Sequence, residues 1–241
     1  MNSELDKFVI SYEGGREYDF DNKVLLNWYP RRVAELCNKG GSLLELGLGH
    51  GYTSPLFSKI FDEHVVVEGS SAVIDNFHRR NPNTEVEIIN ALFEDFETDK
   101  KYDVIIFGFI LEHLEDPVLV LKRFKKFLVD GGRIFVSVPN ALSMNRRLGN
   151  YAGFLDDIYK LTQNDLDLGH KKLYSVESLK QEMNDAGYVV ERMEGLYLKP
   201  FTTAQILSLN LDDKVIEGLC KIGIDYPELC CGLLAEGRID V

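Results

Sequence analysis

The stretch Leu43-Leu44-Glu45-Leu46-Gly47-Leu48-Gly49-His50-Gly51 decides the fold of this chain. An apolar run leads into a loop with three alternating glycines, and helical spacing follows the loop. Glycines suit such a loop because it must turn sharply and let a ligand approach the backbone closely. The stretch therefore predicts a strand, a ligand-binding loop and a helix.

Glu68 is the second signal, at the end of the apolar run His64–Glu68. An acid at the end of the second strand of such a unit accepts hydrogen bonds from ribose hydroxyls. The alternative to a nucleoside site is a tight turn followed by an unrelated surface glutamate. It explains the glycine loop and Glu68 separately, but not their occurrence at the ends of two successive strands. A dinucleotide fold is disfavoured because bulky Tyr52 stands where its third small residue belongs, and a P-loop is excluded because no Gly-Lys-Ser/Thr run exists.

Short apolar runs alternate with helical patterns on both sides of this loop. Strands that are apolar on both faces are typical of parallel sheets covered by helices. Ser70, Asp116 and Ser175 stand in N-cap positions of three helices. The alternation predicts a doubly wound α/β fold. Strands are expected at Ser42–Leu46, His64–Glu68, Val86–Asn90, Tyr102–Phe107, Arg133–Val138, Tyr188–Tyr197 and Leu229–Glu236.

Composition limits the classes of function. The 241 residues suit one α/β domain, and the net charge of -12 repels nucleic acid and anionic lipid. The first residues lack the features of a secretory signal, and no apolar run is long enough for a membrane span, so a cytoplasmic location is expected. The cysteines show no C-x-x-C spacing, which predicts reduced thiols rather than disulfides or a zinc site; they are Cys37, Cys220, Cys230 and Cys231.

The glycine loop resembles the first motif of class I S-adenosylmethionine-dependent methyltransferases, through Glu45-x-Gly47-x-Gly49-x-Gly51. The resemblance covers roughly residues 40–140. Phe107-Gly108-Phe109-Ile110-Leu111-Glu112-His113-Leu114-Glu115-Asp116-Pro117 and Val138-Pro139-Asn140 are similar to the small-molecule branch akin to ubiquinone-biosynthesis methyltransferases. The resemblance implies S-adenosylmethionine as cofactor, S-adenosylhomocysteine as product, and a mostly parallel seven-stranded sheet with an antiparallel last strand.

The resemblance also implies roles for single residues. Glu68 would bind the ribose, Asn90 would read the adenine amine although the family often has Asp there, and Phe109 and Ile110 would flank the methionine end. Tyr12 and Arg16 would close over the methionine carboxylate. The full set of expected cofactor-binding residues is Glu45, Gly47, Gly49, Gly51, Glu68, Gly69, Asn90, Ala91, Leu92, Phe109, Ile110, Tyr12 and Arg16.

We expect one methyltransferase domain over residues 1–241. It has an N-terminal helical cover (1–39), a cofactor-binding core (40–140) and two substrate-side insertions (141–174 and 199–225), the second helical and lying over the carboxyl ends of the strands. Asn140, Arg146 and Arg147 are expected to bind substrate, because paired arginines suit a phosphate or carboxylate.

Methyl transfer from a sulfonium requires alignment of nucleophile, carbon and sulfur, and a hydroxyl nucleophile must also lose a proton. We predict His170 as the general base and His113 as the second candidate. Lys171 and Lys172 are expected to favour the neutral form of the His170 imidazole. The spacing of Asp156-Asp157 and Asp165–Asp167 fits no ligand pattern, so no metal is expected.

The sequence thus predicts a small-molecule O-methyltransferase acting on a metabolite or a surface-polysaccharide precursor. An N-methyltransferase of a small amine and a non-catalytic cofactor-binding protein stay open as alternatives. A nicotinamide-dependent oxidoreductase is disfavoured by Tyr52. Monomer and homodimer are both compatible with the sequence.

Overall fold

The computed structural model describes residues 18–37 and 39–240, so Tyr12 and Arg16 lie outside the described residues. The described strands form one seven-stranded sheet in the order β3-β2-β1-β4-β5-β7-β6. All neighbouring pairs from β3 to β5 are parallel, whereas β7 is antiparallel to both β5 and β6. The predicted fold class is confirmed. The strands are β1 (Ser42–Leu46), β2 (Glu63–Glu68), β3 (Glu87–Asn90), β4 (Tyr102–Gly108), β5 (Leu128–Pro139), β6 (Tyr188–Gly195) and β7 (Gly232–Ile239).

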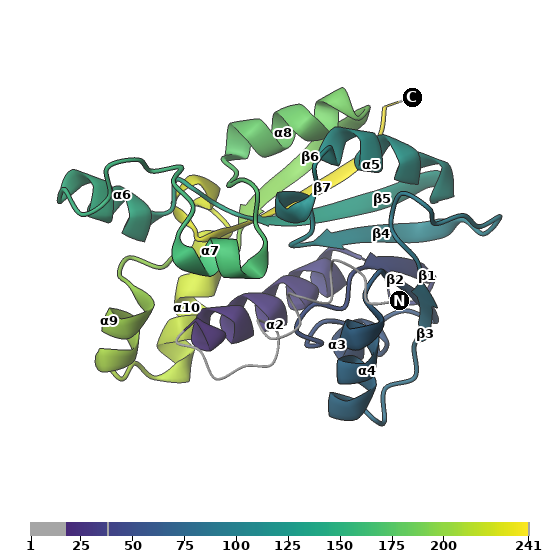
Figure 1. Ribbon diagram of the computed structural model, residues 1–241, viewed down its shortest axis with the longest axis horizontal. Coiled ribbons are helices and arrows are strands. Elements are labelled where there is room, and N and C mark those ends of the chain that lie inside the picture. Colours follow the sequence, from purple (N-terminus) through teal and green to yellow (C-terminus); the bar gives the residue numbers. More distant parts are fainter. Residues whose placement is uncertain (1–17, 38, 241) are drawn as a thin grey trace.

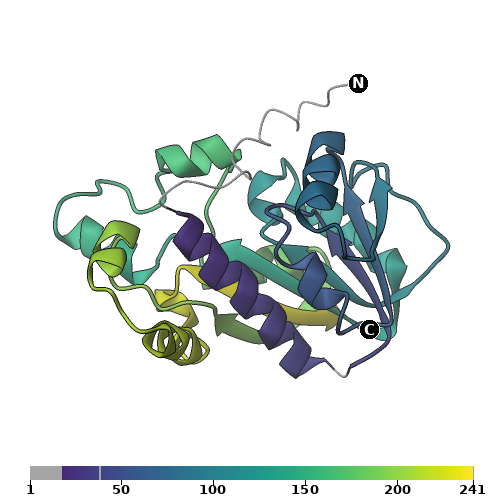
Figure 2. The same cartoon turned by 90° about the horizontal axis from the view of Figure 1, so that it is seen from below.

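Helices cover both faces of the sheet (Figure 1). Alternating side chains of β1 separate the faces: Leu44 packs with α5 and α8, and Leu43 packs with α2, α3 and α10. Figure 2 shows α2 running obliquely across the second face. The helices are α2 (Asp19–Leu36), α3 (Ser54–Phe57), α4 (Ser71–Arg80), α5 (Pro117–Phe124), α6 (Met144–Tyr151), α7 (Gln163–Leu168), α8 (Val176–Asp185), α9 (Thr203–Ser208) and α10 (Asp213–Gly223), with short 3-10 turns η2 (Leu111–His113), η3 (Lys125–Phe127) and η4 (Pro227–Leu229).

The strand order creates a crevice at the carboxyl ends of β1 and β4. The chain builds outward from β1 through β2 to β3, then returns to place β4 on the other side of β1. Leu46, at the end of β1, pairs with Val67 on one side and Phe107 on the other. The loops that follow these strands therefore diverge from one point, which is where open α/β sheets bind ligands.

The later elements differ in extent from the sequence prediction. The strand expected at Arg133–Val138 begins earlier, at Leu128, so Gly131 and Gly132 lie inside β5, where the register shifts against β4. The last strand begins at Gly232 because Pro227–Leu229 form η4. The predicted helical insertion 199–225 contains two helices, α9 and α10.

The caps predicted for α4, α5 and α8 are confirmed. Ser70, Asp116 and Ser175 each accept a hydrogen bond from a backbone amide in the first turn of their helix. Among residues 18–37 and 39–240, no helix combines the length and apolar character that a bilayer crossing requires.

The cap of α5 gives a test of this local structure. Asp116 accepts a hydrogen bond from the Leu119 amide at 2.9 Å, and its side chain has no role in the sheet. Asp116→Ala should lower the free energy of unfolding by about 1 kcal/mol. Urea unfolding measures this change, and Asp116→Asn should largely restore stability because an amide oxygen also caps. An unchanged midpoint of urea unfolding in Asp116→Ala would show that the Asp116 side chain does not stabilise the start of α5.

Candidate active site

A cavity of about 1010 Å³ opens at the carboxyl ends of β1, β2 and β4. Its walls come from the glycine loop, the turns after β2 and β4, α2, α7 and the segment around residue 170. Residues expected from sequence to bind cofactor and residues expected to act in catalysis thus border one space. Those bordering it are Gly47, Gly49, Gly51, Glu68, Gly69, Leu92, Phe109, Ile110, His113, Asn140, Arg146 and His170.

The glycine loop depends on its backbone conformation. Gly47 and Gly49 have φ of 77° and 47°, where other residues are strained. A Cβ on Gly47 would lie 2.6 Å from Cδ1 of Ile110, so the loops after β1 and β4 are in close contact. A Cβ on Gly49 would meet no heavy atom within 4 Å. Because Gly49 borders the cavity, a ligand can approach its backbone from the open side.

Glu45 lies beneath this loop and does not border the cavity. Its buried carboxylate accepts a hydrogen bond from the Thr53 hydroxyl at 2.5 Å, and its other oxygen lies 2.9 Å from Nε2 of His64. The structure therefore places Glu45 as a support that ties the end of the loop to β1. His64 is accounted for by the same contact.

Glu68 borders the cavity and holds the loop at the same time. Its two carboxylate oxygens accept hydrogen bonds from the backbone amides of Leu48 (3.0 Å) and Ser70 (2.8 Å). Glu68 therefore supports the loop with a carboxylate that lies at the cavity wall.

Asn90 and Ala91, which were expected to lie at the adenine, do not line the cavity. The Asn90 amide donates to the backbone oxygen of Glu68 at 2.8 Å, and neither Asn90 nor Ala91 borders the cavity. The following residues, from Leu92 to Asp95, do border it. The segment after β3 is thus at the rim of the cavity, but residues 92–95 line it and Asn90 and Ala91 do not.

Two contacts join α2 to the loops that line the cavity. The Asn22 amide lies 3.2 Å from Nε2 of His50, which joins α2 to the glycine loop. Burial lowers the pKa of His50 to about 4, so this ring is neutral near pH 7. Phe109 has φ of 59°, a strained conformation for a residue with a side chain, and its ring packs edge-on against Tyr29.

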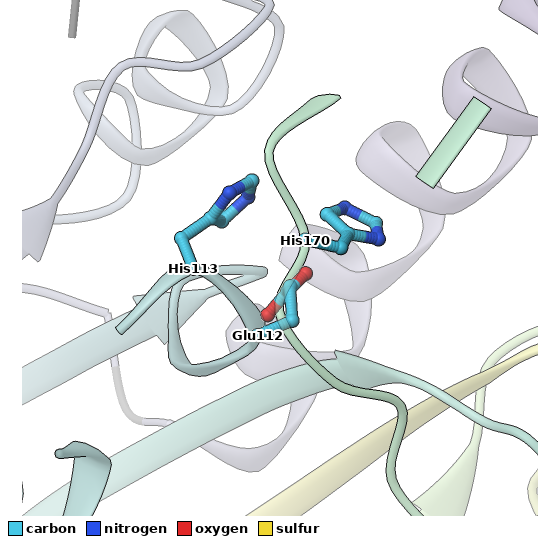
Figure 3. A group of neighbouring side chains, drawn as sticks. All are labelled: Glu112, His113 and His170. Atoms are coloured by element: carbon cyan, nitrogen blue, oxygen red, sulfur yellow. The ribbon is translucent and has the colours of Figure 1, made fainter. Parts of the chain in front are cut away.

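Three titratable side chains converge at the end of β4, as Figure 3 shows. Glu112 and His113 come from η2, and His170 comes from the turn after α7. One nitrogen or oxygen atom from each of the three side chains lies within 4.8 Å of the other two. The imidazole rings of His113 and His170 are nearly perpendicular, with centroids 4.9 Å apart. Gly169 ends α7 at φ of 81°, and the Lys171 amide then donates to the Glu112 carbonyl at 2.7 Å. These contacts hold His170 against η2.

Asp165 fixes the orientation of His170. Its Oδ1 lies 3.0 Å from Nδ1 of His170, while Oδ2 accepts hydrogen bonds from the amide and hydroxyl of Thr162. Burial alone would lower the pKa of His170, but the hydrogen bond to Asp165 and the charges of Glu112 and Asp165 outweigh it and raise that pKa.

The expectation that Lys171 and Lys172 lower the pKa of His170 was wrong. Lys171 pairs with Glu115 at 2.6 Å and Lys172 pairs with Glu182, so both ammonium groups are neutralised by other carboxylates. The buried acids next to the ring decide its charge instead.

The other two members of the cluster are shifted by burial. Burial, assisted by the charge of His170, lowers the pKa of His113 to about 3, so this ring stays neutral. Burial raises the pKa of Glu112 to about 7. The three groups are also close enough to share a bound cation.

The expected substrate-binding residues are engaged mainly with backbone. The Asn140 amide donates to the Cys230 carbonyl at 2.8 Å, and Arg146 donates to the Ile158 carbonyl at 2.7 Å. Arg147 donates to the Leu142 carbonyl at 2.5 Å and does not border the cavity. These side chains hold the segment after β5 in shape, and only Asn140 and Arg146 reach the cavity wall.

Sequence reasoning missed a buried ion pair at the opposite wall. Lys199 Nζ lies 2.6 Å from Oδ2 of Asp21, which joins the insertion 199–225 to α2. Lys199 is the residue of this insertion that borders the cavity, whereas Phe201 and Leu207 are exposed. A lone lysine and a distant aspartate carry no sequence signal, because only the fold brings them together.

Comparison with known proteins gives the family model that this chain matches and the fold that it shares. Residues 18–192 match a family model described as a methyltransferase domain. The chain is 22% identical over 211 residues to a ubiquinone biosynthesis O-methyltransferase of Acinetobacter baumannii (strain ACICU), covering 84% of this chain and 86% of that protein. It is 26% identical over 202 residues to the protein of that description from Aeromonas salmonicida (strain A449), covering 79% and 80%. The fold is similar to that of the N-methyltransferase NodS from Bradyrhizobium japonicum WM9, solved with S-adenosyl-L-homocysteine, with a TM-score of 0.61, 12% identity and coverage of 98% and 97%.

Proposed function

Because this chain belongs to the methyltransferase-domain family, as a class I enzyme that uses S-adenosylmethionine, we propose that its acceptor is a hydroxyl group of a small molecule. The observation that carries the proposal is the His170–Asp165 pair, which borders the same cavity as the glycine loop. A histidine held by a carboxylate through Nδ1 is a suitable general base for a hydroxyl.

The cofactor-binding residues are proposed on the same basis. The open side of Gly49 and the position of the Glu68 carboxylate at the cavity wall, at the end of β2, fit a nucleoside with ribose hydroxyls. Gly47, Gly51, Gly69, Phe109 and Ile110 would border the cofactor, and Leu92 would border its base. Glu45 would contribute by supporting the glycine loop. Asn90 would contribute by holding the backbone of Glu68 in place.

His170 would remove the hydroxyl proton as the acceptor oxygen bonds to the methyl carbon. The sulfonium supplies its own leaving group, because the electron pair of the broken carbon–sulfur bond returns to sulfur. His113, which stays neutral, would wall the reaction centre and is the second candidate base. The protein otherwise contributes alignment and exclusion of water.

The acceptor is proposed to be a metabolite or a surface-polysaccharide precursor. The relatives named ubiquinone biosynthesis O-methyltransferases support oxygen as the acceptor atom, whereas the structural neighbour NodS is an N-methyltransferase. An amine acceptor with a pKa below the working pH would need no base. Assays of S-adenosylhomocysteine formation with matched hydroxyl and amine compounds test this: turnover only with amines would contradict the proposal.

Asn140, Arg146 and Arg147 are proposed to shape the acceptor side of the cavity, with Asn140 and Arg146 at its wall. We further propose one domain, with residues 1–39 as a cover, 40–140 as the cofactor core, and 141–174 and 199–225 as acceptor-side insertions. We propose a cytoplasmic enzyme, and the net charge of -12 disfavours a nucleic-acid partner.

Glu68→Ala tests the proposed ribose contact. The variant should bind S-adenosylmethionine more weakly by about 1.5–3 kcal/mol, the usual scale for hydrogen bonds to a charged group. Calorimetry measures the change, and Glu63→Ala serves as the control because Glu63 is an exposed acid at the other end of β2. Equal affinity in Glu68→Ala and the wild-type enzyme would remove Glu68 from the ribose site.

A further inference from the structure

Glu112 is a buried carboxylate that the proposed mechanism does not use. It is 0% exposed, and neither carboxylate oxygen makes a hydrogen bond of ordinary geometry to any described side chain. Leaving a buried carboxylate without hydrogen-bond partners costs free energy, so its presence beside the cavity calls for a function.

The groups that face Glu112 come from four elements. His113 follows it in η2, Asp165 faces it from the first turn of α7, and His170 faces it from the turn after that helix. The Tyr174 hydroxyl, which donates to Glu182, lies within the electrostatic reach of Glu112. Among these described neighbours the only group that can carry a positive charge near pH 7 is His170, because the pKa of His113 is far lower.

We propose that Glu112 is a switchable counter-charge: ionised opposite the sulfonium before methyl transfer, and protonated through His170 after it. This inference rests on the proposed function. Methyl transfer removes the positive charge of the sulfonium from the cavity and releases one proton from the acceptor. A carboxylate that takes up this proton keeps the buried site close to neutral in both states, which a cavity of low dielectric favours.

The proton balance is complete without a further reactant. The acceptor O–H bond breaks and its proton moves to His170. The oxygen bonds to the methyl carbon, and the carbon–sulfur bond breaks with its electron pair on sulfur. The imidazolium then passes the proton to Glu112, which returns His170 to its neutral form, and Glu112 loses the proton to water after product release. Glu112 thus acts through His170 and not on the acceptor itself.

The location of the cluster and its titration support this role. The pKa of Glu112 is about 7 without cofactor, so the carboxyl group is about half protonated at pH 7. A positive charge placed nearby lowers this pKa and makes the group ionised at the same pH. A carboxylate of ordinary pKa would stay ionised with either ligand and could not switch.

The test uses the two cofactor forms alone and needs no acceptor. Calorimetry on the whole protein gives the affinities for S-adenosylmethionine and S-adenosylhomocysteine. Between about pH 5.5 and pH 8.5 the preference for S-adenosylmethionine should rise on the order of tenfold, the ratio that corresponds to one pKa unit. Glu112→Gln should show a clearly smaller rise, because the ionisation of the ligands and of His170 is common to both proteins and only the contribution of Glu112 is lost.

A second measurement follows the proton directly. Near pH 7, replacing bound S-adenosylmethionine by S-adenosylhomocysteine should take up a fraction of a proton, seen by calorimetry in buffers of different ionisation enthalpy. Glu112→Gln should take up a clearly smaller fraction of a proton, because only His170, among the described neighbours of Glu112, then remains to respond. Glu177→Gln, a change of an exposed acid in the first turn of α8 that does not border the cavity, should retain both the uptake and the pH dependence. Thermal unfolding establishes that the variants fold.

Different failures have different meanings. A preference that is flat with pH in the wild-type protein, or equally pH-dependent in Glu112→Gln, would overturn the counter-charge while leaving methyl transfer intact. Binding of a divalent ion such as Mn²⁺ that requires Glu112 would also overturn it, because the cluster would then hold a cation. If neither cofactor form bound at all, the proposed function itself would fail, and this inference with it.

Discussion

Gly49→Val is expected to abolish cofactor binding, with affinity for S-adenosylmethionine reduced by at least about 100-fold. Two effects combine. A valine at φ of 47° is strained by about 1–2 kcal/mol. Its side chain would also project into open space at the cavity wall, where a ligand must approach the backbone. Calorimetry on the folded variant measures the loss.

Gly131→Val is the matched control for this substitution. Gly131 has φ of 74° and equally open space around its absent Cβ, but it lies in β5 away from the cavity. It should therefore lower stability by a similar amount and leave cofactor affinity unchanged. If Gly49→Val bound cofactor like the wild-type protein, the glycine loop would not be the cofactor site.

His170→Ala should lower kcat by about 10²–10⁴-fold and leave cofactor affinity nearly unchanged, since a positioned base contributes on that scale. The neutral imidazole is the active form, and Asp165 and Glu112 raise its pKa. Activity of the wild-type enzyme should therefore fall as the pH drops through this raised pKa. The variant should lose that acidic limb of the kcat/KM profile.

His113→Ala is the comparison that assigns the base. Because the pKa of His113 is about 3, it is neutral throughout the accessible range and should contribute no acidic limb. Its replacement should change the shape of the cavity and leave the limb in place. A loss of the limb in His113→Ala and not in His170→Ala would move the role of base to His113.

The sheet and the glycine loop could be predicted from sequence because local patterns decide them. Apolar runs, caps and glycines act within a few residues, so β1, the turn of the glycine loop and the end of β2 at Glu68 were predicted correctly. The bounds of β5 and β7 were predicted less well, because a register shift and a 3-10 turn set them.

The chemistry of the site depends on contacts between distant residues, which the sequence does not display. Glu112 is part of a recognisable motif, yet its burial and its closeness to His170 follow only from the fold. The arginines 146 and 147 read as anion ligands in sequence, but backbone carbonyls of the same segment occupy their guanidinium groups. Charge balance around His170 likewise depends on which carboxylate each lysine reaches.

The central claim is that the cavity at the ends of β1, β2 and β4 is built for S-adenosylmethionine. The most direct measurement is calorimetric titration of the wild-type protein with S-adenosylhomocysteine and, separately, with NAD. We predict saturable binding of S-adenosylhomocysteine at one site, and no heat from NAD, because Tyr52 replaces the small residue that a dinucleotide loop requires. Tight binding of NAD with no binding of S-adenosylhomocysteine would contradict the account.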